Sequence, residues 1–286
     1  MKKVHFGLLV LLTTALMGSS FAIGKMGLAY ATPILLVALR FTIAGVIMSI
    51  VVYVWKRPHP NDWRTWIKIA VIGLFQTAGV MGCIFVSLRT ITAGESSILT
   101  FINPLLVVVF GTLFLKLTYS IRQWVGVALG FIGVFITFGA HVDWKIGTLL
   151  GFLSAVSWAI GTLLIKSWGV TVDNWVLTAY QMLSGGVLLL LGSFLLEDPH
   201  FDINYASIFI LAWLAIMASI VQFAGWFYLL RIGDPGKTSA FLFLAPFFGV
   251  LSGWALLDEA IRWYVIVGGL FIFVGIFLVN WTSRKL

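Results

Sequence analysis

Charged residues are scarce in this chain, and their scarcity argues against a soluble domain. Of the 286 residues, 61% are hydrophobic and only 10% are charged, whereas about a quarter of a soluble domain is normally charged. The apolar residues fall into runs of about 20, the length that an α-helix needs to cross a bilayer. Backbone groups in lipid must bond internally, so such runs predict helices rather than barrel strands. We therefore expect an all-α membrane protein.

Residues that build redox, metal and hydrolytic sites are also lacking. Cys83 is the single cysteine, which excludes an intrachain disulfide. No Asp or Glu lies in the middle of an apolar run, which argues against a deeply buried proton relay. The histidines lie in loops or near the ends of the apolar runs: His5, His59, His141 and His200. With no phosphate-binding loop or HExxH motif either, we predict that the protein is not an enzyme and binds no metal or cofactor.

The net charge of +8 is explained by membrane orientation rather than by nucleic-acid binding. The basic residues are spread over short loops and do not cluster on one folded surface. Most of those near span ends fall on one side of the predicted membrane; the exceptions are Lys25, Arg89, Lys145 and Arg262. Because cytoplasmic loops collect Lys and Arg, this bias predicts that both termini lie in the cytoplasm.

The apolar runs predict ten transmembrane helices separated by short connections. We place them at 5–25, 32–55, 66–88, 92–115, 121–140, 147–167, 174–196, 206–230, 236–257 and 263–282. Only the connection after the second helix is long, and its Pro58 and Pro60 prevent the helix from continuing.

The second half of the chain repeats the first. A shift of about 140 residues aligns Gly45 with Gly186, Pro104 with Pro246, Gly126 with Gly268 and Gly133 with Gly275. We predict residues 1–140 as the first repeat and 141–286 as the second, with five helices in each. A unit with an odd number of spans must insert its second copy upside down. Inverted repeats of this kind are typical of secondary transporters, whose site lies near the bilayer midplane.

Arg40 is a charged residue inside a predicted span. It lies about nine residues into the second helix, so roughly 12 Å below the surface at 1.5 Å per residue. Charged groups in lipid are costly and mark candidate sites. Its planar guanidinium suits a carboxylate or a phosphate of a substrate, but it could equally brace helices through backbone carbonyls. Gln181 occupies the matching place in the second repeat without a charge.

Proline interrupts the fourth and ninth helices at matching places. Asn103-Pro104 has Ala245-Pro246 as its copy, and proline removes a backbone donor and kinks a helix. Paired interruptions point to a central transport site, although they could simply shape the packing. Glu95 begins the fourth helix, where it could pair with Arg40 or act as a gate.

Several neutral polar residues complete the candidate site. Gln76 and Gln222 lie inside the third and eighth helices, where amides either bind a polar substrate or join helices. Ser20 in the first helix and Trp158 in the sixth lie on faces rich in small residues. Those faces either pack closely against neighbours or leave space for a ligand.

The ordered combination of these features resembles the drug/metabolite transporter superfamily, and within it the EamA-type ten-span exporters. The resemblance rests on the two inverted five-helix repeats, on Arg40-Phe41, on the two proline breaks and on the glycines of the fifth and tenth helices. It implies that helices one to four and six to nine surround a central cavity. It also implies that helices five and ten pack outside that cavity, where they are candidates for homodimer contacts.

The function expected is export of amino acids or related small polar metabolites through the inner membrane by alternating access. Arg40, Asn103, Gln76 and Gln222 would contact the substrate, and Glu95 would gate or titrate. Two alternatives stay open. One is import or exchange of sugar, nucleotide or phosphate-bearing metabolites, which should require more than one embedded cation. The other is a membrane partner protein that transports nothing, although a sensor would normally carry a soluble output domain.

Overall fold

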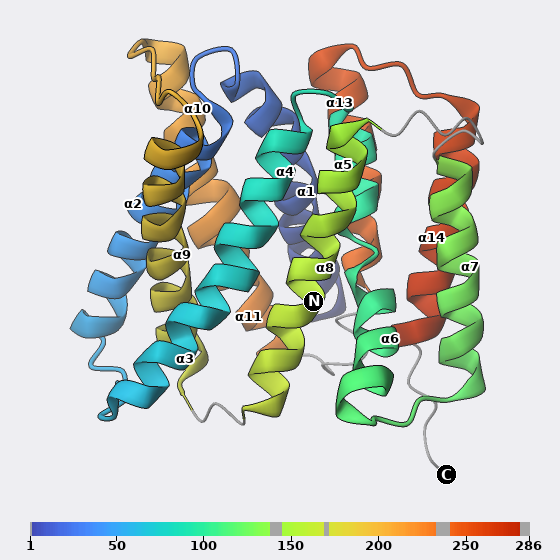
Figure 1. The fold of residues 1–286 in the computed structure, drawn as a ribbon, viewed down its shortest axis with the longest axis horizontal. Helices are drawn as coiled ribbons and strands as arrows, with labels where there is room; N and C mark the ends of the chain where they lie inside the picture. The colour runs from blue at the N-terminus through green and yellow to red at the C-terminus, as the bar shows by residue number, and fades with distance from the viewer. Residues whose placement is uncertain (1, 138–144, 169–171, 233–240, 281–286) are drawn as a thin grey trace.

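The computed structural model describes residues 2–137, 145–168, 172–232 and 241–280. Within these ranges the chain is helical, and the only extended pairing is an isolated antiparallel bridge between Ala31 and Phe201. The helices stand side by side as one bundle (Figure 1). The expectation of an all-α membrane protein is confirmed.

The helices account for the ten predicted spans. Seven stretches are long and apolar enough to cross a bilayer, and three shorter apolar helices complete the set. In chain order the elements are α1 (Lys2–Gly27), α2 (Pro33–Val54), α3 (Trp63–Gly73), η1 (Leu74–Gly79), α4 (Val80–Ser87), α5 (Ala93–Thr100), α6 (Asn103–Leu115), α7 (Ile121–Thr137), α8 (Ile146–Ser167), α9 (Asn174–Leu196), α10 (Tyr205–Ala215), η2 (Ile216–Val221), α11 (Gln222–Ile232), η3 (Phe241–Phe243), α13 (Leu244–Leu257) and α14 (Trp263–Asn280). Parts of the predicted spans at 138–140, 236–240 and 281–282 lie outside the described residues.

Short polar residues explain where several helices begin. Asp62 accepts a hydrogen bond from the backbone of Thr65 at the start of α3, and Asp173 caps α9 in the same way. Such caps satisfy amides that have no partner within the helix. Pro33 lies in the first turn of α2, where its missing N–H costs nothing.

The two halves share local features that the sequence repeat does not reveal. The third span contains a π-helical segment, η1, and the eighth contains another, η2, at the matching place. The fourth and ninth spans both end at a residue in the left-handed region, Lys116 and Asp258, each with φ of 51°. A π-helical segment is rare and is frequently found at a functional site. Its occurrence in both copies supports two repeats of one five-helix unit.

The contacts between helices also match from one repeat to the other. Helix α1 packs against α13, and its counterpart α8 packs against α5 and α6. The matching helices α2 and α9 pack against each other, and so do α7 and α14. Figure 1 shows the α7–α14 pair standing at one edge of the bundle. This pairing is what a two-fold relation between the repeats requires.

Glycines allow the matching helices to approach closely. A Cβ on Gly45 would lie 2.5 Å from the backbone nitrogen of Leu183, and one on Gly186 would lie 2.5 Å from that of Thr42. At the α7–α14 contact, a Cβ on Gly126 would lie 2.6 Å from the carbonyl oxygen of Gly275. Backbones at this separation leave no room for a side chain, as in other close membrane-helix contacts.

The outside of the bundle is apolar, as expected for a protein solvated by lipid. Leu195, Phe114 and Phe135 are 82%, 74% and 61% exposed. Exposed apolar surface of this extent marks a membrane or interaction surface. In a bilayer this surface contacts lipid instead of water, so its exposure carries no free-energy cost.

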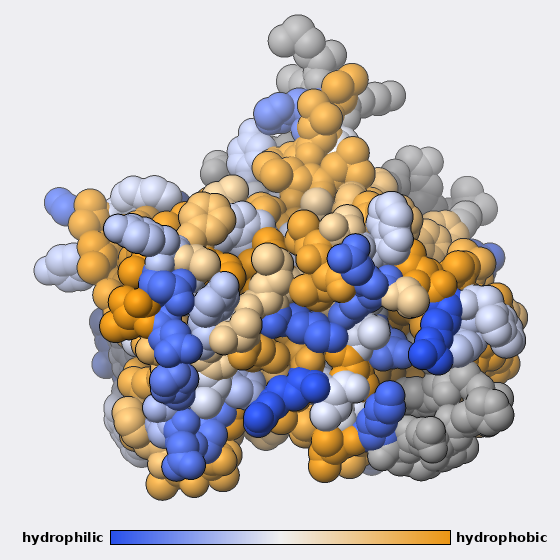
Figure 2. Space-filling model, turned by 90° about the horizontal axis from the view of Figure 1, so that it is seen from above, coloured by the Kyte–Doolittle hydropathy of each residue, from blue (hydrophilic) through white to orange (hydrophobic). Residues whose placement is uncertain are grey.

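The two ends of the bundle differ, and we name them by a lysine at each. The Lys25 face, at the top of Figure 1, contains the connections after α1, α9 and α13. The Lys166 face contains the connections after α2 and α6 and the end of α8. Figure 2 views the bundle from above and shows hydrophilic residues gathered across the upper face among hydrophobic ones.

The α2–α9 contact generates a stability prediction. Gly186→Ala places a methyl group against the backbone of α2 and should lower the free energy of unfolding by about 1–3 kcal/mol through overpacking. Gly192→Ala, on the same helix, is the matched control because the nearest atom to its Cβ lies 4.0 Å away. Thermal unfolding followed by circular dichroism in detergent measures both. Equal midpoints for the two variants would contradict the close crossing.

Candidate substrate cavity

A cavity of about 590 Å³ lies in the centre of the bundle, and we call it the central cavity. Both repeats line it, through α1, α2, η1, α4, α5, α6, α7, α8, α9, α11 and η3 among other elements. All seven residues predicted to bind substrate line this one cavity: Ser20, Arg40, Gln76, Asn103, Trp158, Gln181 and Gln222. The structure therefore brings together residues from both repeats that lie far apart in the chain, while their binding role stays a prediction.

Arg40 is buried in the wall of the cavity and joins the two repeats. Its Nε donates to the hydroxyl of Ser219 at 3.0 Å, and its Nη2 donates to the carbonyl of Ala218 at 2.9 Å. Both partners belong to η2, the π-helical segment of the eighth span. The guanidinium thus braces a helix through a backbone carbonyl, as one of the two predictions held. It also lines the cavity, so the two roles are compatible.

Gln181 occupies the corresponding place on α9, as the repeat predicts. Its Oε1 is buried and has no hydrogen-bond partner in the described part of the chain. A buried amide oxygen without a partner is costly, and this one belongs to a side chain that lines the cavity. A donor on a bound molecule would satisfy it.

The remaining amides lie at or near the π-helical segments and the break in the fourth span. Gln76, within η1, donates from Nε2 to Thr162 at 3.3 Å. Gln222 directly follows η2 and is 3% exposed. Asn103 is the first residue of α6 and is also buried. These three side chains give the cavity wall both donors and acceptors.

Aromatic rings form much of the rest of the wall. The ring centroids of Phe21 and Phe101 are 6.2 Å apart, and those of Phe101 and Trp158 are 5.6 Å apart. Ser20, next to Phe21, bonds to its own helix through the carbonyl of Met17 at 2.7 Å. The cavity therefore combines a few polar groups with a large apolar surface, as ligand sites commonly do.

The predicted interruption of the fourth span is present and lines the cavity, whereas the residues of the predicted ninth span before Phe241 lie outside the described part of the chain. Helix α5 ends at Thr100, and α6 begins at Asn103 with Pro104 in its first turn. In the second repeat, the short η3 precedes α13, whose third residue is Pro246. Pro104 is part of the cavity wall. Pro246 is buried in α13, next to Ala245 whose carbonyl meets Gly18 of α1.

Glu95 does not pair with Arg40. Its carboxylate accepts from the backbone of Thr92 at 3.0 Å, while its own N–H donates to the Thr92 hydroxyl at 3.0 Å. This reciprocal arrangement is a capping box, which satisfies two amides at the start of α5. Glu95 lines a small pocket at the Lys25 face rather than the central cavity. Its gating role stays a prediction.

An ion pair that sequence reasoning missed joins the two repeats at the Lys25 face. Lys25, at the end of α1, lies 2.8 Å from Glu259 in the connection after α13. Lys25 also donates to the carbonyl of Ile91 at 2.9 Å, and Glu259 accepts from the backbone of Ala93 at 2.9 Å. Helices of both repeats are therefore tied at one point. Both residues are placed on one side of the membrane by the sequence, but no local spacing relates positions so far apart.

A second set of contacts between the repeats lies on the same face. Glu197 accepts from the backbone of Leu35 at 2.8 Å and of Ile34 at 3.3 Å, so it caps α2 from the other repeat. Beside it the bridge pairs Ala31 with Phe201, and Thr32 donates to the carbonyl of His200 at 3.0 Å. Backbone hydrogen bonds and contacts of charged side chains thus join the two repeats at the Lys25 face.

The central cavity reaches toward the opposite end. Lys166, Tyr119 and Gln123 line it, and Lys166 is an exposed residue at the end of α8. Toward the Lys25 face, the lining residues Phe21 and Phe85 are 5% and 1% exposed. The cavity therefore runs from a buried aromatic layer to the Lys166 face.

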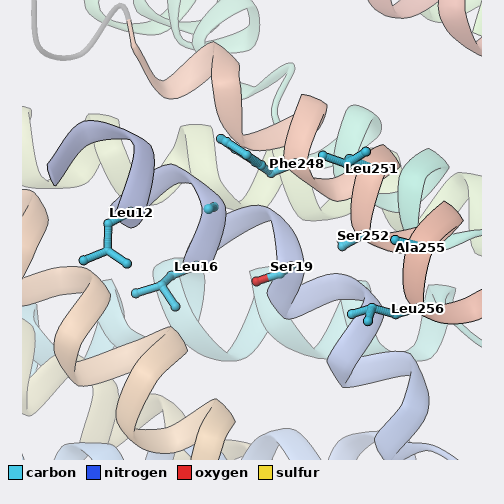
Figure 3. Close-up of a pocket in the computed structure, with 9 residues that line it drawn as sticks. Leu12, Leu16, Ser19, Phe248, Leu251, Ser252, Ala255 and Leu256 are labelled. Atoms are coloured by element: carbon cyan, nitrogen blue, oxygen red, sulfur yellow. The ribbon is translucent and has the colours of Figure 1, made fainter. Parts of the chain in front are cut away.

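A second pocket, of about 300 Å³, lies between α1 and α13 and differs in character (Figure 3). Leu12 and Leu16 line it from one helix, and Phe248 and Leu251 from the other, with Ser19 and Ser252 as its polar side chains. Leu12 is 47% exposed, so the pocket belongs to the outer surface of the bundle. None of the predicted site residues lies in it.

No metal site is found in the described ranges, where no three His, Cys, Asp or Glu side chains lie together.

Tyr119 lies outside the helices, and burial raises the pKa of its phenol. It is therefore uncharged in the neutral pH range.

A bundle of two inverted repeats around one partly polar cavity defines a secondary transporter fold. Residues 5–139 and 145–281 each match the EamA-like transporter family, and the chain belongs to this family. It is similar to the uncharacterized transporter YvbV of Bacillus subtilis (strain 168), with 31% identity over 99% of this chain and 93% of the relative. The predicted resemblance is confirmed, and the chain is a transporter of this family.

More distant relatives extend the likeness beyond bacteria. A WAT1-related chloroplastic protein of Arabidopsis thaliana, At3g02690, is 27% identical over 93% of this chain and 67% of the relative. A solved structure described as the crystal structure of a protein aligns with a TM-score of 0.69 at 21% identity, covering 99% of both chains. The latter shows the fold alone.

The Lys25–Glu259 pair generates an accessibility prediction. Glu259→Gln removes the charge that holds α1 to the start of α5, so the central cavity should become accessible from the Lys25 face. A single cysteine would be introduced by Met17→Cys in a Cys83→Ser background. We expect it to react with a membrane-impermeant maleimide, added on the side of the Lys25 face, severalfold faster in the Glu259→Gln variant than in the protein that keeps Glu259. Asp202→Asn, another carboxylate-to-amide change on the same face, should leave the rate unchanged. Equal rates in the two variants would mean that the pair does not close this face.

Proposed function

We propose that this transporter exports amino acids or related small polar metabolites across the inner membrane by alternating access. The single observation that carries the proposal is the central cavity, where Arg40, Gln76, Gln181 and Gln222 come together at the junction of two inverted repeats. Polar groups are expensive at this depth. A site built there from both halves is what a carrier needs, since each half can move against the other around it.

We propose a role for each of the candidate residues. Arg40 would bind a carboxylate with the N–H groups that Ser219 and Ala218 do not use. The amides of Gln76, Asn103, Gln181 and Gln222 would orient the polar remainder, and Ser20 and Trp158 would bound the space. Pro104 and Pro246 would supply the points at which the fourth and ninth spans bend, and Glu95 would act at the rim of the Lys25 face.

Alternating access would exchange the two ends of the bundle. In this structure the cavity reaches the Lys166 face, while the Lys25–Glu259 pair and the Ala31–Phe201 bridge cross the opposite face. With both termini in the cytoplasm, as the distribution of Lys and Arg predicts, the Lys166 face is cytoplasmic. The structure would then be the inward-facing state. Rupture of the contacts at the Lys25 face would release the substrate outward.

A phosphate-bearing substrate is the weaker candidate. It should require at least two cations near one another, and the charged residues that line the cavity in the described ranges are Arg40 and Lys166. Lys166 is eight residues beyond Trp158 on α8, so roughly 12 Å further along the helix, at the mouth. The two cations therefore do not converge on one group.

Homodimerisation through the fifth and tenth helices is a further proposal. The glycine faces of α7 and α14 are used within the chain, where Gly126 meets Gly275 and Gly133 meets Gly268. A dimer would have to use the outward faces of these helices, where Ile132 is 48% and Leu270 59% exposed.

Counterflow tests the proposed function. Purified protein in liposomes would be preloaded with an unlabelled compound and given the labelled form outside, at equal pH on both sides. The panel would contain amino acids and the hydroxy acids with the same side chains. Uptake above empty liposomes for some members is expected. Flat traces across the panel, from protein shown to be folded, would contradict the proposal.

Arg40→Ala tests the role of the guanidinium. Charged hydrogen bonds contribute about 1.5–3 kcal/mol, so the variant should weaken apparent affinity for carboxylate-bearing substrates by roughly tenfold to 100-fold. Arg122→Ala removes an exposed arginine at the start of α7 and serves as the control. Concentration-dependent counterflow gives the affinity of each variant. An unchanged affinity in correctly inserted Arg40→Ala protein would show that Arg40 only braces helices.

A further inference from the structure

The charge of Arg40 has no carboxylate partner in the described part of the chain. The ion pairs found there join Lys25 with Glu259, Arg57 with Asp173 and His200 with Asp202. The two groups that Arg40 contacts by hydrogen bonds, a hydroxyl and a backbone carbonyl, are both neutral. A cation buried without a counter-charge is strongly unfavourable. An anionic ligand would supply that missing charge.

The guanidinium is also available to such a ligand. It carries five N–H donors, and Ser219 and Ala218 occupy one on Nε and one on Nη2. The donors that remain include both on Nη1, and the side chain lines the central cavity. A planar guanidinium with free donors is matched by a carboxylate.

The rest of the cavity disfavours a second charge on the ligand. No Asp or Glu is among the described residues that line it. The ammonium group of an amino acid would therefore lose its hydration without gaining an ion pair. The rings of Phe21, Phe101 and Trp158 instead offer apolar surface in the cavity wall. Their arrangement fits an uncharged apolar body attached to the carboxylate.

We infer that the central cavity carries monoanionic carboxylates with an apolar body in preference to zwitterionic amino acids, and that the membrane potential alone drives their export. This inference rests on the proposed function and narrows its substrate class. A hydroxyl donor on the ligand, as in a 2-hydroxy acid, would satisfy the free acceptor on Gln181.

The driving force follows from the charges in the two forms of the carrier. One bound carboxylate neutralises the guanidinium of Arg40, whereas the empty site keeps its positive charge; Lys166 lies at the mouth in both forms. Because the loaded site is neutral, an inside-negative potential acts on the empty carrier and favours its return to the inward-facing state, so that each cycle moves one negative charge outward. Each 100 mV would sustain an accumulation ratio of about 50-fold for a monoanion. No coupling ion is required, which agrees with the lack of a described acidic residue in the cavity wall.

The test uses two matched pairs of labelled probes in proteoliposomes: 3-phenyllactate with phenylalanine, and 2-hydroxyisocaproate with leucine. Within each pair the side chain is the same, and only the hydroxyl or ammonium group differs. Valinomycin with a potassium gradient sets the potential while pH is equal on both sides. The ratio of probe concentrations inside and outside the liposome at equilibrium does not depend on the orientation in which the protein is inserted.

We expect the hydroxy acids to exchange faster than their amino-acid partners. At an inside-positive potential of about 60 mV they should accumulate about tenfold, as a single negative charge requires. Reversal of the potential should abolish the accumulation. A protonophore should have no effect on the ratio.

Three variants separate charge from structure. Arg40→Gln should lose the preference for the anion, because a bound carboxylate would then have no cation beside it. Ser219→Ala removes one hydrogen bond of Arg40 but keeps its charge, so it should retain this preference even if transport is slower. Arg122→Gln makes the same charge change at an exposed site and should behave as the unaltered protein.

The outcomes distinguish this inference from the proposed function. Failure of every probe to exchange would overturn both. Exchange of phenylalanine or leucine at least as fast as the hydroxy acids would overturn the substrate class and leave transport standing. Anion exchange whose accumulation ignores the potential, or collapses with a protonophore, would overturn the potential-driven cycle.

Discussion

The hydrogen bonds of Arg40 to Ser219 and Ala218 are the interaction on which the site depends. They cross from the second helix of one repeat to the π-helical segment of the other, at the depth where lipid offers no substitute partner. A π-helical turn displaces backbone carbonyls from the regular ladder, and one of these accepts from the guanidinium. The same contact holds the cation in the cavity wall. The same hydrogen bonds of Arg40 therefore both join the two helices and hold the guanidinium at the cavity.

The side chains at the matching place and at the π-helical segment of the other half are neutral, so the two halves of the cavity wall differ chemically. Gln181 replaces Arg40, and the hydroxyl of Ser157 donates to the carbonyl of Phe75, in the π-helical segment of the third span, at 2.8 Å. Two nearly equivalent halves thus support the same backbone irregularity by different chemistry. Under the proposed function, an asymmetric ligand would suit such a site, because one end would meet a cation and the other would meet amides. The backbone symmetry would allow the halves to exchange positions, while the side chains would hold the bound ligand in one orientation.

Much of this arrangement could be predicted from the sequence. The long apolar runs determine the spans because a bilayer admits only internally bonded helices, and the aligned glycines and prolines identify the repeat. The polar residues within the spans were predicted to form one site because burial in lipid is expensive, and they do line one cavity. The π-helical segments could not be predicted, since they depend on tertiary partners such as Arg40 and Ser157. The Lys25–Glu259 pair was missed for a related reason: it joins residues far apart in the chain, and only the folded bundle brings them together. Pairing of Glu95 with Arg40 was one of two possibilities that the sequence left open, and the local capping bond of Glu95 with Thr92 replaces it.

The central claim is that the Lys25 face must open for substrate to leave, and a reversible cross-link tests it most directly. Ala31→Cys with Phe201→Cys, in a Cys83→Ser background, places thiols at the one bridge that pairs the two halves at this face, where directly paired strand residues lie within reach of a disulfide. Counterflow would be measured before oxidation, after oxidation and after reduction. The account predicts that the cross-link stops counterflow and that reduction restores it. Undiminished counterflow in fully cross-linked protein would contradict alternating access through this face.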